Sequence, residues 1–485
     1  MSYPQFVPRT AVTSSFVEGK ECRFLTCMDA TKINSDLAKS NPAIFGDITP
    51  NGNSRLIAAA SNPDHNIKLY LHNDTSDTLT FFGNLSGHTA PIHDVVFGHM
   101  NEHPNILVSA AEDGYIAAWD VRSGKNIMNF NRPNLNGKMY SCDIRGNTVL
   151  AGGEKGIYFY DIRNAGLLTF SDSSHTDEVT QVRFHPTNTN LVFSGSEDML
   201  INVYDLTLGS LNSLEDLIDN TLPTEQPVAK FGFFGPEHQY LWAISPIETL
   251  SLWNIDECEM TASYSGIRDS INQTVVTALG FDRDAFFEEG MDDEDDGMAS
   301  NNESEEKEDE MFVPASFDES ESEFGAVEHA MSPVNGCDTY AYNVSSQFST
   351  DLISKVASSS PKSISKMHPS MWRVDNLIKC EFSTQTGALR LVSGTIGGGL
   401  IISDLSPKTV TPFCLMPPGV CHNTRVRDCI WGGEKASLIT CAQDSRLALW
   451  TPHGKATKPL STAGAPVRQG SRNKSTAAPY SRGRV

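Results

Sequence analysis

The 485-residue sequence lacks the features of secreted and membrane-spanning chains. Its first residues, MSYPQFVPRT, do not form the charged and then apolar run of a signal peptide. No stretch approaches the roughly 20 apolar residues that are needed to cross a bilayer. The ten cysteines include no CxxC pair, and scattered cysteines without a secretory signal are typical of reduced thiols. We therefore expect an intracellular protein, cytoplasmic or nuclear, with no membrane partner.

Motifs for catalysis and for cofactor binding are also missing. There is no GxSxG elbow, and none of the Gly-Lys pairs is followed by serine or threonine, as a phosphate-binding loop requires. Cys414, Cys421, Cys429 and Cys441 lie near His422, but their spacings of 7, 8 and 12 residues match no familiar zinc knuckle. Cysteines of buried strands explain them better. We expect no catalytic residue, no cofactor and no metal.

The net charge of −23 is concentrated in one segment. Residues 284–323 hold 18 acidic side chains and one lysine, whereas residues 454–485 hold seven lysines and arginines and no acid. A segment with this much charge and so few aliphatic residues cannot bury a core of its own. We therefore predict that residues from about 284 to 325 are disordered, and that the chain ends in a disordered basic tail.

One pattern of four residue types recurs three times. Each copy has a histidine, then a hydroxyl residue four positions before an aspartate, then an aromatic residue six positions after that aspartate. The copies are His88, Ser109, Asp113 and Trp119; His175, Ser194, Asp198 and Tyr204; and His422, Thr440, Asp444 and Trp450. Serine, histidine and aspartate also make a hydrolase triad, but a catalytic triad does not occur three times in one chain. The repetition favours a structural role.

The period of the repeat predicts the fold. Strand-ending aromatic residues at positions 70, 119, 160, 204 and 253 are separated by 49, 41, 44 and 49 residues. Units of about 40 to 50 residues with several short strands each are typical of a β-propeller with four strands per blade. The 150 residues from Trp253 to Ser403 indicate an insertion of roughly 100 residues in one unit. The count predicts an all-β, seven-bladed propeller, and a strand in FVPRTAVTSSF completes the last blade.

The repeats resemble the WD40 family over most of residues 5–453, the insertion excepted. The pairs Gly87-His88 and Trp119-Asp120 match the two signature dipeptides of that family. The resemblance implies that histidine, hydroxyl, aspartate and aromatic residue form a buried hydrogen-bonded chain in each of the three copies.

The resemblance and the composition together predict four regions. Residues 1–266 form blades 1 to 5, and residues 371–453 form blades 6 and 7. Residues 267–370 are an inserted, largely disordered acidic segment. Residues 454–485 are the basic tail.

A propeller without an active site acts through its surfaces. We expect a non-catalytic protein-protein interaction scaffold, which escorts or assembles a basic partner such as a ribosomal protein or a histone. The alternative is a substrate receptor of a cullin-RING ubiquitin ligase. It rests on a resemblance of ILVSAAEDGYIAAWDVR to the WD-x-R box of some WD40 proteins. The predicted partner-binding residues are Asp120 and Arg122, with Asp161 and Arg163 in a looser copy. We expect no nucleic-acid binding beyond weak contacts of the tail.

Overall fold

The computed structural model of the chain describes twelve stretches of residues. They are 6–13, 24–40, 52–76, 78–130, 137–209, 211, 213–287, 368–384, 386–407, 409–419, 422–432 and 437–452. The expected basic tail, residues 454–485, and most of the expected acidic insertion lie outside them.

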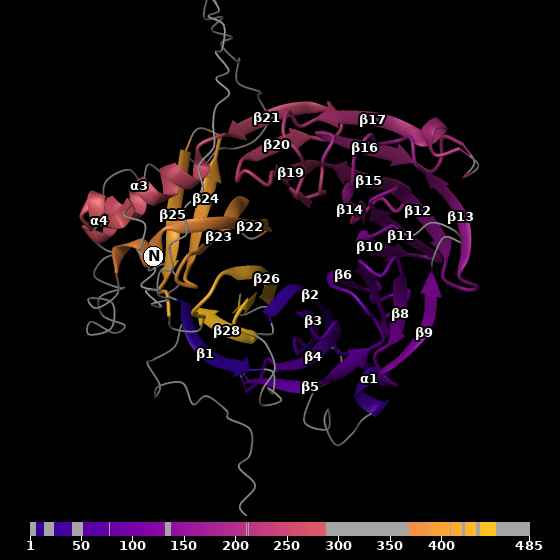
Figure 1. Ribbon diagram of the computed structural model, residues 1–485, viewed down its shortest axis with the longest axis horizontal. Coiled ribbons are helices and arrows are strands. Elements are labelled where there is room, and N and C mark those ends of the chain that lie inside the picture. The colour runs from indigo at the N-terminus through magenta and orange to yellow at the C-terminus, as the bar shows by residue number, and fades with distance from the viewer. Residues whose placement is uncertain are drawn as a thin grey trace, which may run out of the picture.

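The described residues form seven four-stranded antiparallel sheets arranged in a ring (Figure 1). The prediction of a seven-bladed propeller is thus confirmed. Blades 1 to 3 are β2 (Phe24–Lys32), β3 (Arg55–Asn62), β4 (Asn66–Asn73), β5 (Thr78–Ser86); β6 (Ile92–Phe97), β7 (Ile106–Ala111), β8 (Ile116–Asp120), β9 (Lys125–Phe130); and β10 (Met139–Arg145), β11 (Thr148–Gly153), β12 (Gly156–Asp161), β13 (Gly166–Ser171). Blades 4 and 5 are β14 (Val179–Phe184), β15 (Leu191–Ser196), β16 (Leu200–Asp205), β17 (Ile218–Pro223); and β18 (Lys230–Phe234), β19 (Tyr240–Ile244), β20 (Leu250–Asn254), β21 (Glu259–Tyr264). Blades 6 and 7 are β22 (Val374–Ser383), β23 (Ala388–Thr395), β24 (Leu400–Ser406), β25 (Thr409–Met416); and β26 (Val426–Gly432), β27 (Ser437–Ala442), β28 (Arg446–Pro452), β1 (Phe6–Thr13).

The burial of each strand follows from its place in the ring. The middle strands of a blade pack against neighbouring blades on both faces, so they read as continuous apolar runs. Every residue of β12 is buried, and so is every residue of β27. The outer strand β9 is mostly exposed. The first strand of each blade lines the central channel, and the fourth lies at the rim (Figure 1).

Blade 7 joins the two ends of the propeller. β1 pairs antiparallel with β28, from Phe6 opposite Pro452 to Thr13 opposite Arg446, with one irregularity between Pro8 and Thr10. The remaining strands of this sheet, β26 to β28, come from the C-terminal end of the described chain. The ring is therefore closed by backbone hydrogen bonds within one sheet.

Three short helices flank the connection between blades 5 and 6. α3 (Ile267–Leu279) packs on β22 and β25, with Ile271 and Val275 fully buried, and ends at Gly280, whose φ of 68° caps the helix. α4 (Arg283–Phe287) and the 3-10 helix η2 (Pro369–Trp372) pack against each other beside it (Figure 1). α1 (Ser35–Ser40) and η1 (Glu215–Leu217) lie in blades 1 and 4.

The first part of the expected insertion is therefore structured. The predicted disorder from residue 284 onward is wrong for residues 284–287, because α4 buries Phe286 against the rings of Phe281 and Phe287 and the core around Trp372. Residues 288–367 lie outside the described residues, so disorder from 288 to 325 stays a prediction.

Candidate functional site

In blade 2 the predicted residues form one hydrogen-bonded chain. The Nδ1 of His88 lies 2.9 Å from Asp113 Oδ2, and its Nε2 lies 2.7 Å from Ser109 Oγ. The indole Nε1–H of Trp119 donates to the same Oγ at 2.9 Å. Backbone N–H groups of Thr89 and Tyr115 also donate to the Asp113 carboxylate. This chain ties the turn between β7 and β8 to the loop that enters β6.

Blade 4 repeats the arrangement with a phenol in place of the indole. His175 lies 2.9 Å from Asp198 Oδ2 and 2.7 Å from Ser194 Oγ, and that Oγ is 3.3 Å from Tyr204 Oη. The amide of Asn202 lies 3.3 Å from His175 Nε2.

Blade 7 holds the third chain. His422 lies 3.1 Å from Asp444 Oδ1 and 2.8 Å from Thr440 Oγ1, and Trp450 Nε1–H donates to that Oγ1 at 3.0 Å. The hydroxyl residues of all three chains are fully buried. A hydroxyl enclosed between an imidazole and an aromatic side chain cannot reach a substrate, so the arrangement suits a structural role.

The electrostatics of these chains agree with that role. Burial alone would raise the pKa of Asp113, but the hydrogen bonds from His88 and from Thr89 N–H outweigh it and lower the pKa below its ordinary value. The pKa of Asp444 is lowered in the same way. Burial lowers the pKa of His175, against the opposing effect of Asp198. Asp113 and Asp444 therefore act as ionised acceptors at neutral pH.

The residues of the WD-x-R box lie at the opposite end of the sheets. Arg122 donates to both carboxylate oxygens of Asp120, at 3.0 and 3.1 Å, and Arg163 binds Asp161 in the same bidentate way. These guanidinium groups are thus already paired within their own turns. Arg163 remains 68% exposed and Arg122 44% exposed.

A ring of hydrogen bonds around the channel was missed by sequence reasoning. At each of the seven blade junctions, a side chain near the channel bonds to a backbone group of the next blade's first strand. At six junctions a side-chain oxygen accepts from a backbone N–H: Asp29 from Phe97 (2.7 Å), Asp94 from Cys142 (3.1 Å), Asp143 from Phe184 (2.7 Å), Gln181 from Phe231 (2.7 Å), Glu248 from Leu377 and Asp428 from Met28 (3.0 Å). At the seventh junction the side-chain amide of Asn376 donates to the carbonyl oxygen of Val426 at 3.0 Å. The signal for four of these hydrogen bonds was an aspartate within the first strand of a blade, as in IHDVVF.

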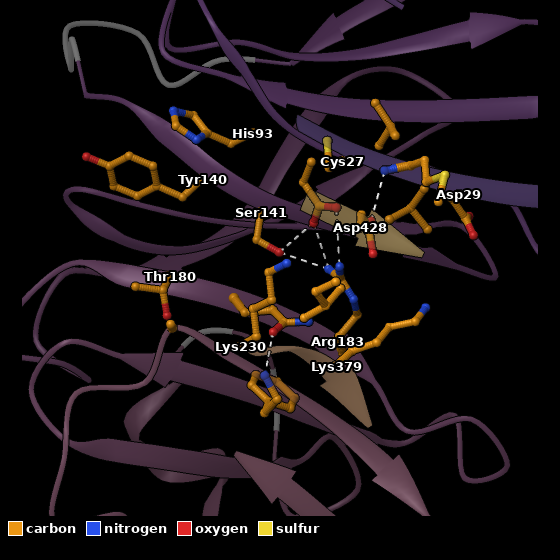
Figure 2. Close-up of a pocket in the computed structure, with 18 of the residues that line it drawn as sticks. Cys27, Asp29, His93, Tyr140, Ser141, Thr180, Arg183, Lys230, Lys379 and Asp428 are labelled. Carbon is orange, nitrogen blue, oxygen red and sulfur yellow. Dashed lines mark hydrogen bonds and ion pairs between the residues drawn. The ribbon is translucent and has the colours of Figure 1, made fainter. Parts of the chain in front are cut away.

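The channel holds a cavity of about 570 Å³, lined by the first strands of all seven blades and by Trp242 of β19. Figure 2 shows its residues, with Cys27 and Asp29 on one side and Arg183, Lys230 and Lys379 on the other. The indole of Trp242 lies over Gly232, where an added Cβ would come within 2.5 Å of it. A glycine in β18 therefore gives this aromatic ring its place beside the channel.

Most charges inside the cavity are compensated by neighbouring groups. Arg183 donates to both oxygens of Asp94, at 2.8 and 3.2 Å, and to Cys142 O at 2.9 Å. Burial raises the pKa of Asp29 to about 6. Burial alone would lower the pKa of Lys379, but nearby acidic groups, among them Asp428, raise it overall. Lys379 is therefore protonated at neutral pH.

An acidic patch covers one face of blade 4. Strands alternate in direction, so the loop before the first strand and the loop between the second and third strands lie at the same end of a blade. We name this end the entry face. On it, the loops of blade 4 carry five acidic residues with exposed or half-buried side chains, which are Asp172, Asp177, Glu178, Glu197 and Glu225. None of the five makes an ion pair within the described residues; they are called the blade 4 patch below.

Two lysines on the entry-face loops of blade 3 are paired with acids outside this patch. Lys138 binds Glu112 at 3.1 Å and Lys155 binds Glu154 at 2.8 Å. Glu178 and Glu197 also line the mouth of the channel cavity. Burial raises the pKa of Tyr140, which lines the same cavity, and a hydrogen bond to Glu178 raises it further. These two lysines therefore do not neutralise the blade 4 patch.

The described residues hold neither a metal-binding cluster nor a membrane-spanning helix. Among the described residues, no three histidine, cysteine or acidic side chains gather closely enough to hold a metal ion. Cys414, Cys429 and Cys441 are buried on strands, and Cys421 lies outside the described residues. The helices of the described part of the chain are too short and too polar to span a bilayer.

Comparison with known proteins agrees with the propeller. The family model for the WD domain, G-beta repeat, matches residues 79–120 and 166–205. The chain contains WD40 repeats. The matched segments cover most of blade 2 and of blade 4, whose hydrogen-bonded chains are described above. WD40 propellers serve as platforms for binding other proteins.

The chain spans about half the length of the similar proteins that it matches. The WD repeat-containing protein 89 homolog of Dictyostelium discoideum is 33% identical over 208 residues, which are 43% of this chain and 53% of that protein. The WD repeat-containing protein GTS1 of Arabidopsis thaliana is 30% identical over 45% of this chain and 57% of its own length. The histone acetyltransferase type B subunit 2 of Candida glabrata is 27% identical over 36% and 41%, respectively.

Proposed function

We propose that this WD40 chain is a non-catalytic scaffold that binds a basic protein, such as a histone or a ribosomal protein, through the blade 4 patch. The observation that carries the proposal is the set of five acidic side chains without ion pairs on one blade. Four of them, all except Glu225, stand on the two loops that the hydrogen-bonded chain of His175, Ser194 and Asp198 joins. A rigid platform lowers the entropy lost on binding.

The surroundings of the patch also suit a protein partner. Met199 lies in the same turn as Glu197 and is 45% exposed. It offers an apolar contact in the same turn as an acidic side chain, and methionine adapts its shape to different partners. One similar protein is named as a subunit of a histone acetyltransferase. That name is consistent with a basic partner for this chain.

The acidic segment 288–323 adds charge to the same molecule, at another connection of the propeller. Acidic surfaces increase the rate of encounter with a basic partner, and the effect weakens as salt screens it. The patch and the segment are separate contributions, because residues 288–323 belong to the connection between blades 5 and 6, whereas the patch belongs to blade 4. An experiment must therefore vary them independently.

The test is binding of a fluorescent lysine- and arginine-rich peptide, measured by anisotropy over a salt series. We expect the triple variant Asp177→Asn/Glu197→Gln/Glu225→Gln to bind more weakly and with a smaller dependence on salt. The matched control neutralises three exposed acids at the opposite end of the blades, Glu237, Asp256 and Glu257.

A second arm deletes residues 288–323 and leaves α4 intact. If the deletion abolishes binding while the triple variant binds like the wild type, the patch is not the site and the proposal fails. Equal weakening by the triple variant and by its control would show that only net charge matters, which also refutes a site on blade 4.

A further inference from the structure

The turn between β19 and β20 of blade 5 differs from the same turn in blade 4. The strands that flank it pair in the same register in both blades, so the two turns have equal length. In blade 4 the middle position of this turn holds Asp198, which points inward to bind His175. In blade 5 that position holds Ile247, whose side chain is 64% exposed. The turn of blade 5 therefore presents an apolar side chain on the entry face.

Hydrogen bonds fix the turn that carries Ile247. The backbone N–H of Ser245 donates to Thr249 O at 3.0 Å, and the N–H of Thr249 donates to Ser245 Oγ at 3.1 Å. The carboxylate of Glu248 accepts from Leu377 N–H of the next blade. Ile247 is the most exposed of the large apolar side chains that the structure describes. An exposed group on a fixed turn loses little entropy on binding.

A second exposed apolar side chain and an acid of the blade 4 patch adjoin this turn. The N–H and the hydroxyl of Thr224 both donate to Met199 O, at 2.9 and 2.8 Å, so the loop with Glu225 lies against the turn with Met199. A pocket of about 120 Å³ separates that loop from the turn of Ile247. Its lining includes Glu225 and six hydroxyl residues, which are Thr224, Ser245, Thr249, Ser251, Ser263 and Ser265.

We propose that the junction of blades 4 and 5 binds a segment of the basic partner in which an apolar side chain stands beside a lysine or an arginine. The apolar side chain packs on Ile247 and Met199. The cation enters the pocket, where the carboxylate of Glu225 and the hydroxyl oxygens accept its hydrogen bonds.

Two features of the surface support this choice of partner. Exposed apolar groups rimmed by polar residues are typical of protein-binding surfaces, and the negative charge of the blade 4 patch favours a basic segment. The inference rests on the proposed function and adds to it, because charge alone does not decide which basic segment binds.

The test compares two series of fluorescent lysine- and arginine-rich peptides by anisotropy. In one series a single leucine occupies each position in turn, and in the other series serine takes its place. We expect at least one leucine peptide to bind the wild-type chain about ten-fold more tightly than its serine counterpart. Ile247→Ser should remove this difference. It should leave binding of the serine peptide unchanged, because the blade 4 patch is intact.

Two control variants accompany Ile247→Ser. Ile127→Ser changes another exposed isoleucine, which lies on the rim strand β9 and is 48% exposed, and it should keep the preference for leucine. Ile247→Leu retains an apolar side chain and should keep the preference as well. The melting temperatures of all three should match that of the wild type, because these side chains are exposed.

The outcomes separate this inference from the proposed function. If the leucine and serine peptides bind the wild type equally, the inference is wrong and the proposed function stands. If neither series binds, both fail. A preference for leucine that persists in Ile247→Ser also overturns the inference. Analytical ultracentrifugation tests another occupant: if the wild type is a dimer and Ile247→Ser is a monomer, the surface binds a second copy of the chain and the proposal is wrong.

Discussion

Replacing Asp113 by alanine tests the role of the repeated hydrogen-bonded chains. The carboxylate accepts from His88 Nδ1 at 2.9 Å, from Thr89 N–H at 2.9 Å and from Tyr115 N–H at 3.1 Å. The two backbone donors belong to exposed residues and can turn to water, whereas the side chain of His88 is only 2% exposed. The largest part of the loss therefore comes from this imidazole.

The magnitude follows from these contacts. A hydrogen bond contributes about 1 kcal/mol net, and a buried donor left without an acceptor costs about 1–3 kcal/mol. We expect Asp113→Ala to lower the free energy of unfolding by about 2–3 kcal/mol. Asp113→Asn keeps an acceptor oxygen of similar shape, so it should lose less.

The assay is equilibrium unfolding in urea, monitored by circular dichroism. Asp172→Ala is the control, because Asp172 is exposed and makes no hydrogen bond within the described residues. A denaturation midpoint of Asp113→Ala equal to that of the control would refute the structural role of the chain in blade 2.

Three other predictions follow from the structure. Burial lowers the pKa of His175 below 6.5, so the unfolded chain takes up the proton first. Stability should then fall as the pH drops below 6.5, with a smaller fall in His175→Gln when both are unfolded in urea at pH 7.5 and 5.5. If the cullin-ligase alternative holds, Arg122→Ala should recover less ligase adaptor in a pull-down while its melting temperature is unchanged; equal recovery contradicts it. Gly232→Ala places a Cβ against Trp242 and should cost about 1–3 kcal/mol by thermal unfolding, whereas Gly83→Ala, which meets open space, should cost little.

The repeats made the fold predictable, because the same residue types recur at the same spacings within single blades. The offsets of Ser109, Asp113 and Trp119 place those groups on two strands and the turn between them, so their proximity could be read from spacing alone. The helix α3 was missed, although its apolar residues at 267, 271 and 275 follow helical spacing. Residues 267–279 were grouped with the acidic run that follows them, and the whole segment was therefore predicted to be largely disordered.

The channel could not be predicted in the same way. Lys230 and Lys379 are far apart in the sequence, and the ring topology alone brings β18 and β22 to neighbouring places. A lysine on a strand is also usually solvent-exposed, so neither residue stood out. The hydrogen bonds across blade junctions depend on how the first strands of two adjacent blades are oriented and aligned. The residue spacing within one blade does not determine that arrangement.

The helices between blades 5 and 6 have a consequence for how this chain can change. α4 ends at Phe287 and η2 begins at Pro369, and the two pack together, so the inserted chain leaves and re-enters the fold at one place. The entropy of closing such a loop grows only slowly with its length. Residues 288–367 can therefore lengthen, shorten or change composition over evolution at small cost to the ring, which leaves selection free to act on that segment independently of the propeller.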